Sequence, residues 1–127
     1  MNSDDMMNAL KHERWTKVCF RNEAEVVGLA YIDFREEYAD VFALHGDNTA
    51  NAYRANLKLT ADGETSAFQP SSVAWACVGQ SEVVFSALLD LPKPTPGAPV
   101  IELRDNKNGC IPEEWMRLHF EFLSSPK

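Results

Sequence analysis

The sequence predicts a mainly antiparallel β domain of the α+β class, built as a curved sheet or barrel-like domain with one or two short helices. Turn signals recur at roughly ten-residue spacing, which is typical of antiparallel sheets. The segments between them are rich in β-branched and aromatic residues and alternate along the chain. A two-layer α+β sandwich is the alternative arrangement. A chain of 127 residues is long enough to bury a core as one domain spanning 1–127.

The N-terminal part of the chain is expected to form a helix followed by two strands. Residues 4–12 fit a short helix with Ser3 as its cap. Residues 15–20 and 25–34 are predicted strands. Because glycine weakens a strand interior, Gly28 inside the second strand indicates a bulge, a bend or the close approach of another group.

The next segments are predicted to add a strand and a hairpin. Residues 35–45 fit either a helix or a strand, and we favour the strand. A turn cluster follows at 46–48, and a short helix over 47–53 is the alternative for that region. Residues 57–68 are expected to form a hairpin about Asp62-Gly63, a dipeptide preferred in tight hairpin turns.

The C-terminal part begins with a proline-rich stretch. Residues 92–99 hold four of the seven prolines and predict a stiff surface loop within the domain. A strand over 100–103 and a turn at Asn108-Gly109 are expected next. Residues 111–123 carry two patterns, a helix begun by Pro112 and a strictly alternating strand, and the alternation favours the strand.

The stretch 72–91 is predicted to be the central β-hairpin, with Gln80 and Ser81 as its loop. One face of this hairpin is wholly apolar apart from its ends. The other is mostly apolar, so it is expected to be covered by a helix of the chain, a second sheet, another subunit or a ligand. The residues of this second face that we predict to bind a ligand or form an interface are Trp75, Cys77, Val84, Ser86, Leu88 and Asp90.

Composition and charge exclude several classes of protein. The net charge is −7 and the 12 basic residues are scattered, which argues against binding to nucleic acid or to an anionic membrane. The acidic N-terminus lacks the features of a signal peptide, so a cytoplasmic location is expected. Three cysteines, without CxxC spacing, are expected to be reduced thiols.

Histidines provide the candidate chemistry. On a strand, His119 and Glu121 would point the same way and form an acid–base pair, although a solvated strand face has the same pattern. His45 and Asp47 have a spacing seen in some metal sites, but a metal needs three or four converging donors. The sequence therefore predicts no metal and no cofactor. Cys77 is interpreted as a structural thiol, since no basic residue lies close to it in sequence.

Three functions of different class follow from these observations. The first is a cytoplasmic binding protein that uses the apolar hairpin face for a small apolar ligand or for homodimerisation. The second is a small metal-independent acid–base enzyme, an isomerase or hydrolase, using His119, Glu121 and His45. The third is an acidic inhibitor-type protein that binds a basic protein partner. It predicts that four acids gather on one surface: Asp33, Glu36, Glu37 and Asp40.

Overall fold

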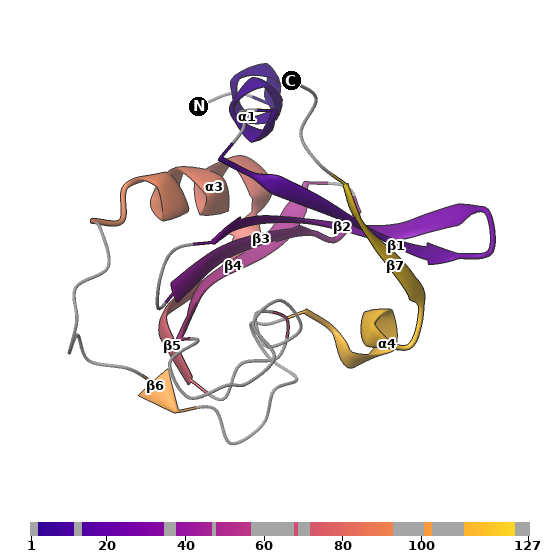
Figure 1. Cartoon of the computed structure of the whole chain (residues 1–127). Helices are drawn as coiled ribbons and strands as arrows, with labels where there is room; N and C mark the ends of the chain where they lie inside the picture. Colours follow the sequence, from indigo (N-terminus) through magenta and orange to yellow (C-terminus); the bar gives the residue numbers. More distant parts are fainter. Residues whose placement is uncertain are drawn as a thin grey trace.

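The computed structural model describes residues 3–11, 14–34, 38–46, 48–56, 68, 72–92, 101–102 and 111–123. The elements in this part of the chain follow one another as shown in Figure 1. In chain order they are α1 Ser3–Leu10, β1 Thr16–Asn22, β2 Glu25–Phe34, β3 Tyr38–Leu44, β4 Thr49–Asn56, β5 Ser72–Gln80, α3 Ser81–Leu89, β6 Ile101–Glu102, α4 Glu113–Met116 and β7 His119–Leu123.

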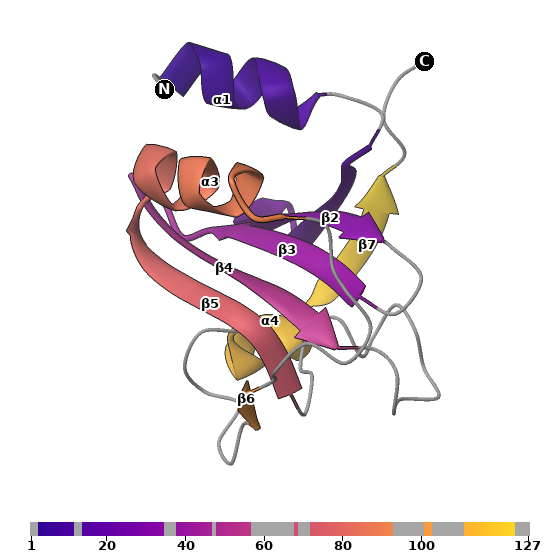
Figure 2. The same ribbon diagram turned by 90° about the vertical axis from the view of Figure 1, so that its left-hand side faces the viewer.

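The strands form one antiparallel sheet in the order β6-β5-β4-β3-β2-β1-β7. Strands β1 to β5 are neighbours both in sequence and in space, while β7 returns to the outer side of β1. The sheet curls but does not close (Figure 1). Helices α1 and α3 lie on one side of it and α4 on the other (Figure 2). The predicted class, an antiparallel β domain of the α+β type with a curved sheet and short helices, is confirmed.

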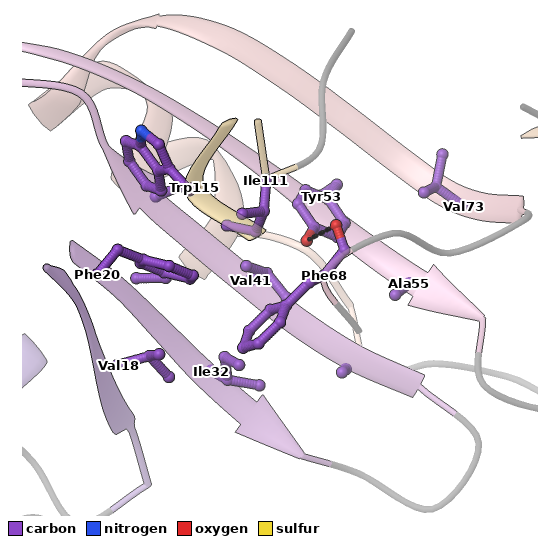
Figure 3. Packing of buried hydrophobic residues seen from close by; sticks show 13 residues of the cluster. Val18, Phe20, Ile32, Val41, Tyr53, Ala55, Phe68, Val73, Ile111 and Trp115 are labelled. Carbon is purple, nitrogen blue, oxygen red and sulfur yellow. Dashed lines mark hydrogen bonds between the residues drawn. The ribbon is translucent and has the colours of Figure 1, made fainter. Parts of the chain in front are cut away.

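We call the side of the sheet that faces α4 the inner face. Figure 3 shows its core, in which aromatic and branched side chains from the strands meet Phe68, Ile111 and Trp115. The Tyr53 hydroxyl donates a hydrogen bond to the carbonyl oxygen of Phe68 at 3.2 Å. The backbone N–H of Ile111 donates to the same oxygen at 3.2 Å, so two separate segments are held over the sheet. The remaining buried members are Val18, Phe20, Ala30, Ile32, Ala39, Val41, Ala43, Ala55 and Val73.

We call the opposite side, covered by α1 and α3, the helical face. Phe85 of α3 is fully buried there and packs against two rings, with centroids 5.8 Å from Trp15 and 5.0 Å from Phe42. Tilted aromatic pairs of this kind contribute to stability beyond the burial of their surface. The other buried members of this core are Met6, Leu10, Tyr31, Ala50, Ala52, Val84 and Leu88.

The predicted central hairpin is wrong in its second half. β5 forms as expected, but residues 81–89 form helix α3 instead of a returning strand. Its buried residues Ser81, Val84, Phe85 and Leu88 recur at helical spacing. A short run of apolar residues fits the periods of helix and strand equally, and here the uncovered helical face decides in favour of the helix.

The alternative short helix over 47–53 is also wrong, because β4 occupies Thr49–Asn56. Its alanines and asparagines have low strand propensity, but β3 and β5 supply backbone hydrogen bonds on both sides. The segment 111–123 divides between the two predicted patterns. Helix α4 forms first, and the predicted strand is confined to β7.

Most of the remaining predictions are confirmed in position. Helix α1, strands β1 and β2, and strand β3 within 35–45 all form. The turn at 46–48 has positive φ angles of 79° at Gly46 and 60° at Asn48. The two-residue strand β6 falls within the predicted 100–103. The predicted hairpin 57–68, loop 92–99 and turn at 108–109 lie outside the described residues, except for Phe68 and Pro92.

Candidate functional site

The outer edge of β5 is the first candidate site. β5 pairs with β4 along almost its whole length, but on its other side β6 pairs only with Ser72 and Val73. Within the part of the chain that the structure describes, no strand pairs with the outer edge from Ala74 to Gln80. Figure 2 shows this edge at the lower left, with β6 at one end and α3 at the other. An unpaired edge offers backbone donors and acceptors to another strand.

The backbone hydrogen bonds show which residues of β5 direct their groups outward. Ser81 N–H donates to the Asn48 carbonyl at 2.8 Å, so this pair is hydrogen-bonded. In an antiparallel ladder hydrogen-bonded and non-bonded pairs alternate, and a residue of a non-bonded pair points its N–H and C=O away from its partner. Counting back along the register, Ala76, Val78 and Gln80 are in non-bonded pairs with β4. Their backbone groups therefore point toward the open edge.

The same residues are exposed. Ala76 and Gln80 are solvent-exposed, and Val78 is 70% exposed, the largest exposure among the large hydrophobic side chains in the described residues. Val83, in the first turn of α3 directly after β5, is 61% exposed. Residues 72–80 include no charged residue and no proline. The open edge is thus uncharged and partly apolar.

A second candidate lies beside this edge on the inner face. His45 Nε2 donates a hydrogen bond to Oδ1 of Asn51, and the imidazole ring lies 4.8 Å from the Trp115 ring at an interplanar angle of 33°. Asn51 is 2% exposed and is directly opposite Val78 in the β4–β5 register. Trp115, His45 and Asn51 therefore lie in a row that leads to Val78 at the exposed edge, and we call these three residues the polar strip.

Gly28 makes room for this arrangement. A Cβ atom at that position would lie 2.4 Å from two atoms of the Trp115 ring, far closer than any real contact. The close approach predicted for Gly28 is thus provided by an indole, and the register shift between Phe20 and Arg21 lies opposite it. The indole then forms the support on which the imidazole rests.

The chemistry available to His45 is limited by its partners. A neutral imidazole that donates from Nε2 keeps Nδ1 as an acceptor. In the described part of the chain, its side-chain partners are an amide and an indole, whereas a catalytic imidazole is commonly oriented by a carboxylate. The arrangement is suited to accepting a hydrogen bond from a docked group.

A buried row of charges crosses the helical face. Asp40, 1% exposed, accepts two hydrogen bonds from Arg54, from Nε at 2.6 Å and from Nη2 at 3.1 Å. Arg54 Nη1 donates to the Pro92 carbonyl at 2.7 Å. Asp33, opposite Asp40 in the sheet, forms an ion pair with Arg14 at 2.9 Å. Two of the four acids on which the inhibitor hypothesis rests are therefore buried beside arginines; Glu36 and Glu37 lie outside the described residues.

The predicted ligand or interface residues are divided between β5 and α3. Trp75 and Cys77 are half-buried and pack against the helical-face core, to which α3 contributes Val84 and Leu88. The chain's own helix therefore covers their side of the sheet. The other two residues of the set also lie at α3, with Ser86 half-buried in the helix and Asp90 exposed at its C-terminal cap. Their role in binding stays a prediction.

The predicted catalytic candidates come from two separate parts of the described backbone, and their role in catalysis stays a prediction. His119 and Glu121 are on β7, opposite Arg21 and Cys19 of β1, and their side chains lie outside the described part. Strands β1 and β2 separate β7 from β3, which His45 follows. The residues that do surround His45 were not identified from sequence, because an asparagine in a strand and a distant tryptophan carry no local signal.

The described residues provide neither a metal site nor a membrane-spanning helix. They contain no group of three or more histidine, cysteine, aspartate or glutamate side chains placed to hold a metal ion. None of the helices found there has the length and apolar character needed to cross a membrane.

Comparisons of the chain with protein-family models, curated proteins and solved structures find no match.

Proposed function

We propose that the chain is a binding protein that docks an extended segment of a polypeptide on the outer edge of β5 by strand addition. In this mode the backbone of the incoming segment supplies the main hydrogen bonds, and alternate side chains supply selectivity. The observation that carries the proposal is the open stretch from Ala74 to Gln80, whose outward backbone groups belong to exposed, uncharged residues.

The surroundings of the edge indicate what the docked segment would contact. On the inner face it would run beside Val78, with Asn51 and His45 one step further in. On the helical face it would run beside Cys77 and the first turn of α3, where Val83 is exposed. An apolar side chain facing Val78 and a hydrogen-bond donor within reach of His45 Nδ1 would suit this site.

The proposal places the protein in the cytoplasm, where a thiol such as Cys77 stays reduced. The charge of the chain also bears on the docked segment. With a net charge of −7, an acidic segment would be repelled at long range, so neutral or basic segments are favoured.

The test is a selection of short randomised peptides on the full chain. The chain is immobilised at low density, so that neighbouring copies cannot pair with each other. Enriched peptides are then measured against the wild type, Val78→Pro and Val78→Thr. Proline removes the outward N–H and is tolerated at strand edges, where that group serves no ladder bond. Threonine keeps both the N–H and the branched shape, and is the matched control.

We expect the enriched peptides to bind Val78→Pro at least about tenfold more weakly than the wild type, because one backbone hydrogen bond is lost and the proline ring obstructs the edge. Val78→Thr should retain binding within about threefold of the wild type, since it removes no backbone donor. Equal binding to the wild type and Val78→Pro would refute the proposal. Failure to enrich any peptide would refute it as well.

A further inference from the structure

We infer that the segment docked on β5 is the β5 strand of a second copy of this chain, antiparallel to the first about a two-fold axis at Cys77. This inference rests on the proposed strand addition and names its partner. The open stretch runs from Ala74 to Gln80, and its midpoint is Cys77. A two-fold axis at that residue therefore pairs the whole open stretch with itself and leaves β6 undisturbed on each copy.

The hydrogen-bond phase agrees with this axis. With Cys77 facing its own symmetry mate, Ala76 faces the partner's Val78, and Val78 faces the partner's Ala76. Both residues direct their N–H and C=O groups outward, so each of these pairs forms a hydrogen-bonded pair of an antiparallel ladder. A closed two-fold interface requires such a self-complementary surface.

Charge favours this edge over other surfaces as the place where two copies meet. The chain carries a net charge of −7, so two copies repel each other over most approaches. Residues 72–80 carry no charge, and like charges do not oppose each other across the axis. Natural edge strands commonly bear charged residues or proline that prevent such pairing, and β5 has neither.

The side chains on the helical face fit the same register. Trp75, half-buried in a single copy, faces the partner's Gly79, which has no side chain to exclude the indole. The indole would thus have room to lie over the partner's strand at Gly79. The exposed Val78 would lie against the partner's Ala76 on the inner face. Both side chains would lose solvent-accessible surface in the dimer.

The first experiment measures mass against concentration by sedimentation velocity on the full chain under reducing conditions. We expect a reversible dimer of twice the 14.3 kDa chain mass. Val78→Pro should raise the dimer dissociation constant at least about tenfold, and Val78→Thr should leave it within about threefold. Val78→Lys, at a position 70% exposed, adds like charges near the axis without entering the core and should also raise it at least about tenfold. This variant carries the test if Val78→Pro does not fold.

The second experiment tests the register. Opposed residues in a non-hydrogen-bonded pair have Cα atoms about 4.5 Å apart, within the range that a disulfide spans. Treatment with oxidised glutathione should therefore link two wild-type chains through Cys77. The link should persist in Cys110→Ser and disappear in Cys77→Ser.

The outcomes separate the inference from the proposed function. A concentration-dependent dimer that both edge variants weaken, together with the Cys77 link, supports the second copy at this register. A monomer at every concentration overturns the inference, while peptide binding that depends on Val78 would still uphold strand addition. A dimer unaffected by Val78→Pro and Val78→Lys overturns the inference, since the contact then lies elsewhere. A dimer that both edge variants weaken but that forms no Cys77 link overturns the axis at Cys77.

Discussion

Replacing Gly28 by alanine should destabilise the protein through one contact, that with Trp115. The new Cβ would lie 2.4 Å from Cη2 and Cζ2 of the indole, whereas carbon atoms in contact prefer about 3.5–4.0 Å. Overpacking of this kind costs about 1–3 kcal/mol. Alanine in place of glycine within a strand returns about 0.5–1 kcal/mol of that cost. We therefore expect a net loss of about 1–2 kcal/mol in the free energy of unfolding.

The assay is equilibrium urea unfolding followed by far-UV circular dichroism, on the wild type, Gly28→Ala, Trp115→Leu and the double variant. Leucine lacks the six-membered ring whose atoms meet the new methyl group. In the Trp115→Leu background, Gly28→Ala should therefore become neutral or stabilising by about 0.5–1 kcal/mol. The coupling energy of the cycle should be roughly 2 kcal/mol, within the range for residues in contact. Equal destabilisation in both backgrounds would refute the contact as the reason for glycine at this position.

Three more predictions test other parts of the structure. Asp40→Asn should lower the free energy of unfolding by about 3–5 kcal/mol in urea titrations, because it removes the counter-charge of the buried Arg54 guanidinium. The Arg54 side chain is 8% exposed. A loss below about 1 kcal/mol would mean that the pair behaves as a surface salt bridge. Phe85→Ala should lower the free energy of unfolding by about 3–5 kcal/mol, because Phe85 is fully buried between two rings. The control Val83→Ala, at an exposed position of the same helix, should lower it by no more than about 0.5 kcal/mol. Similar losses from both would contradict the orientation of α3. Burial raises the pKa of Tyr31 above 10.0, so the folded state keeps the phenol proton that the unfolded state releases at high pH. The stability that Tyr31 contributes is therefore fully present below pH 10.0 and is lost as the pH rises through the raised pKa. In alkaline unfolding titrations, Tyr31→Phe should show a smaller loss of stability than the wild type, and an unchanged pH profile would contradict this.

Strands with a strong local pattern were predictable from the sequence. β2, for example, occupies the predicted range 25–34 because its branched and aromatic residues favour a strand by themselves. β4 was missed for the opposite reason. Its sequence, TANAYRAN, has little strand propensity, and its conformation depends on β3 and β5, which lie on either side of it. A central strand of this kind is specified by tertiary context, and no local pattern indicates it.

The error at residues 81–89 has a related cause. The segment SEVVFSALL is apolar at both the strand and the helix period, so its pattern cannot distinguish them. Assigning a hairpin placed Trp75, Val84 and Leu88 on one sheet face. In the structure the last two belong to the helix that packs over the first. That face of β5 is covered, as expected, and the cover is helix α3, which residues 81–89 of the same stretch form.

The polar strip could not be predicted, because Asn51 lies in a strand with no local signal and Trp115 comes from a distant part of the chain. His45 was identified as a candidate for its chemistry, but it was associated with Asp47 and with His119. The structure places it instead beside Asn51 and Trp115. Helix α4 is short and contributes the indole, and only the folding of that helix under the sheet brings it to the imidazole.

The sequence of β5 is typical of an interior strand, although β5 lies near the edge of the sheet. Its sequence from Val73 to Gly79 has the uncharged, apolar character of a strand with a neighbour on each side. Among the strands that the structure describes, its one full neighbour is β4, and β6 covers two of its residues. β7, at the opposite end of the sheet, alternates His119 and Glu121 with phenylalanines, and so carries the kind of residues that discourage pairing at an edge. If a second copy adds its strand to β5, then β5 becomes an interior strand of the joint sheet, and its uncharged sequence suits that position.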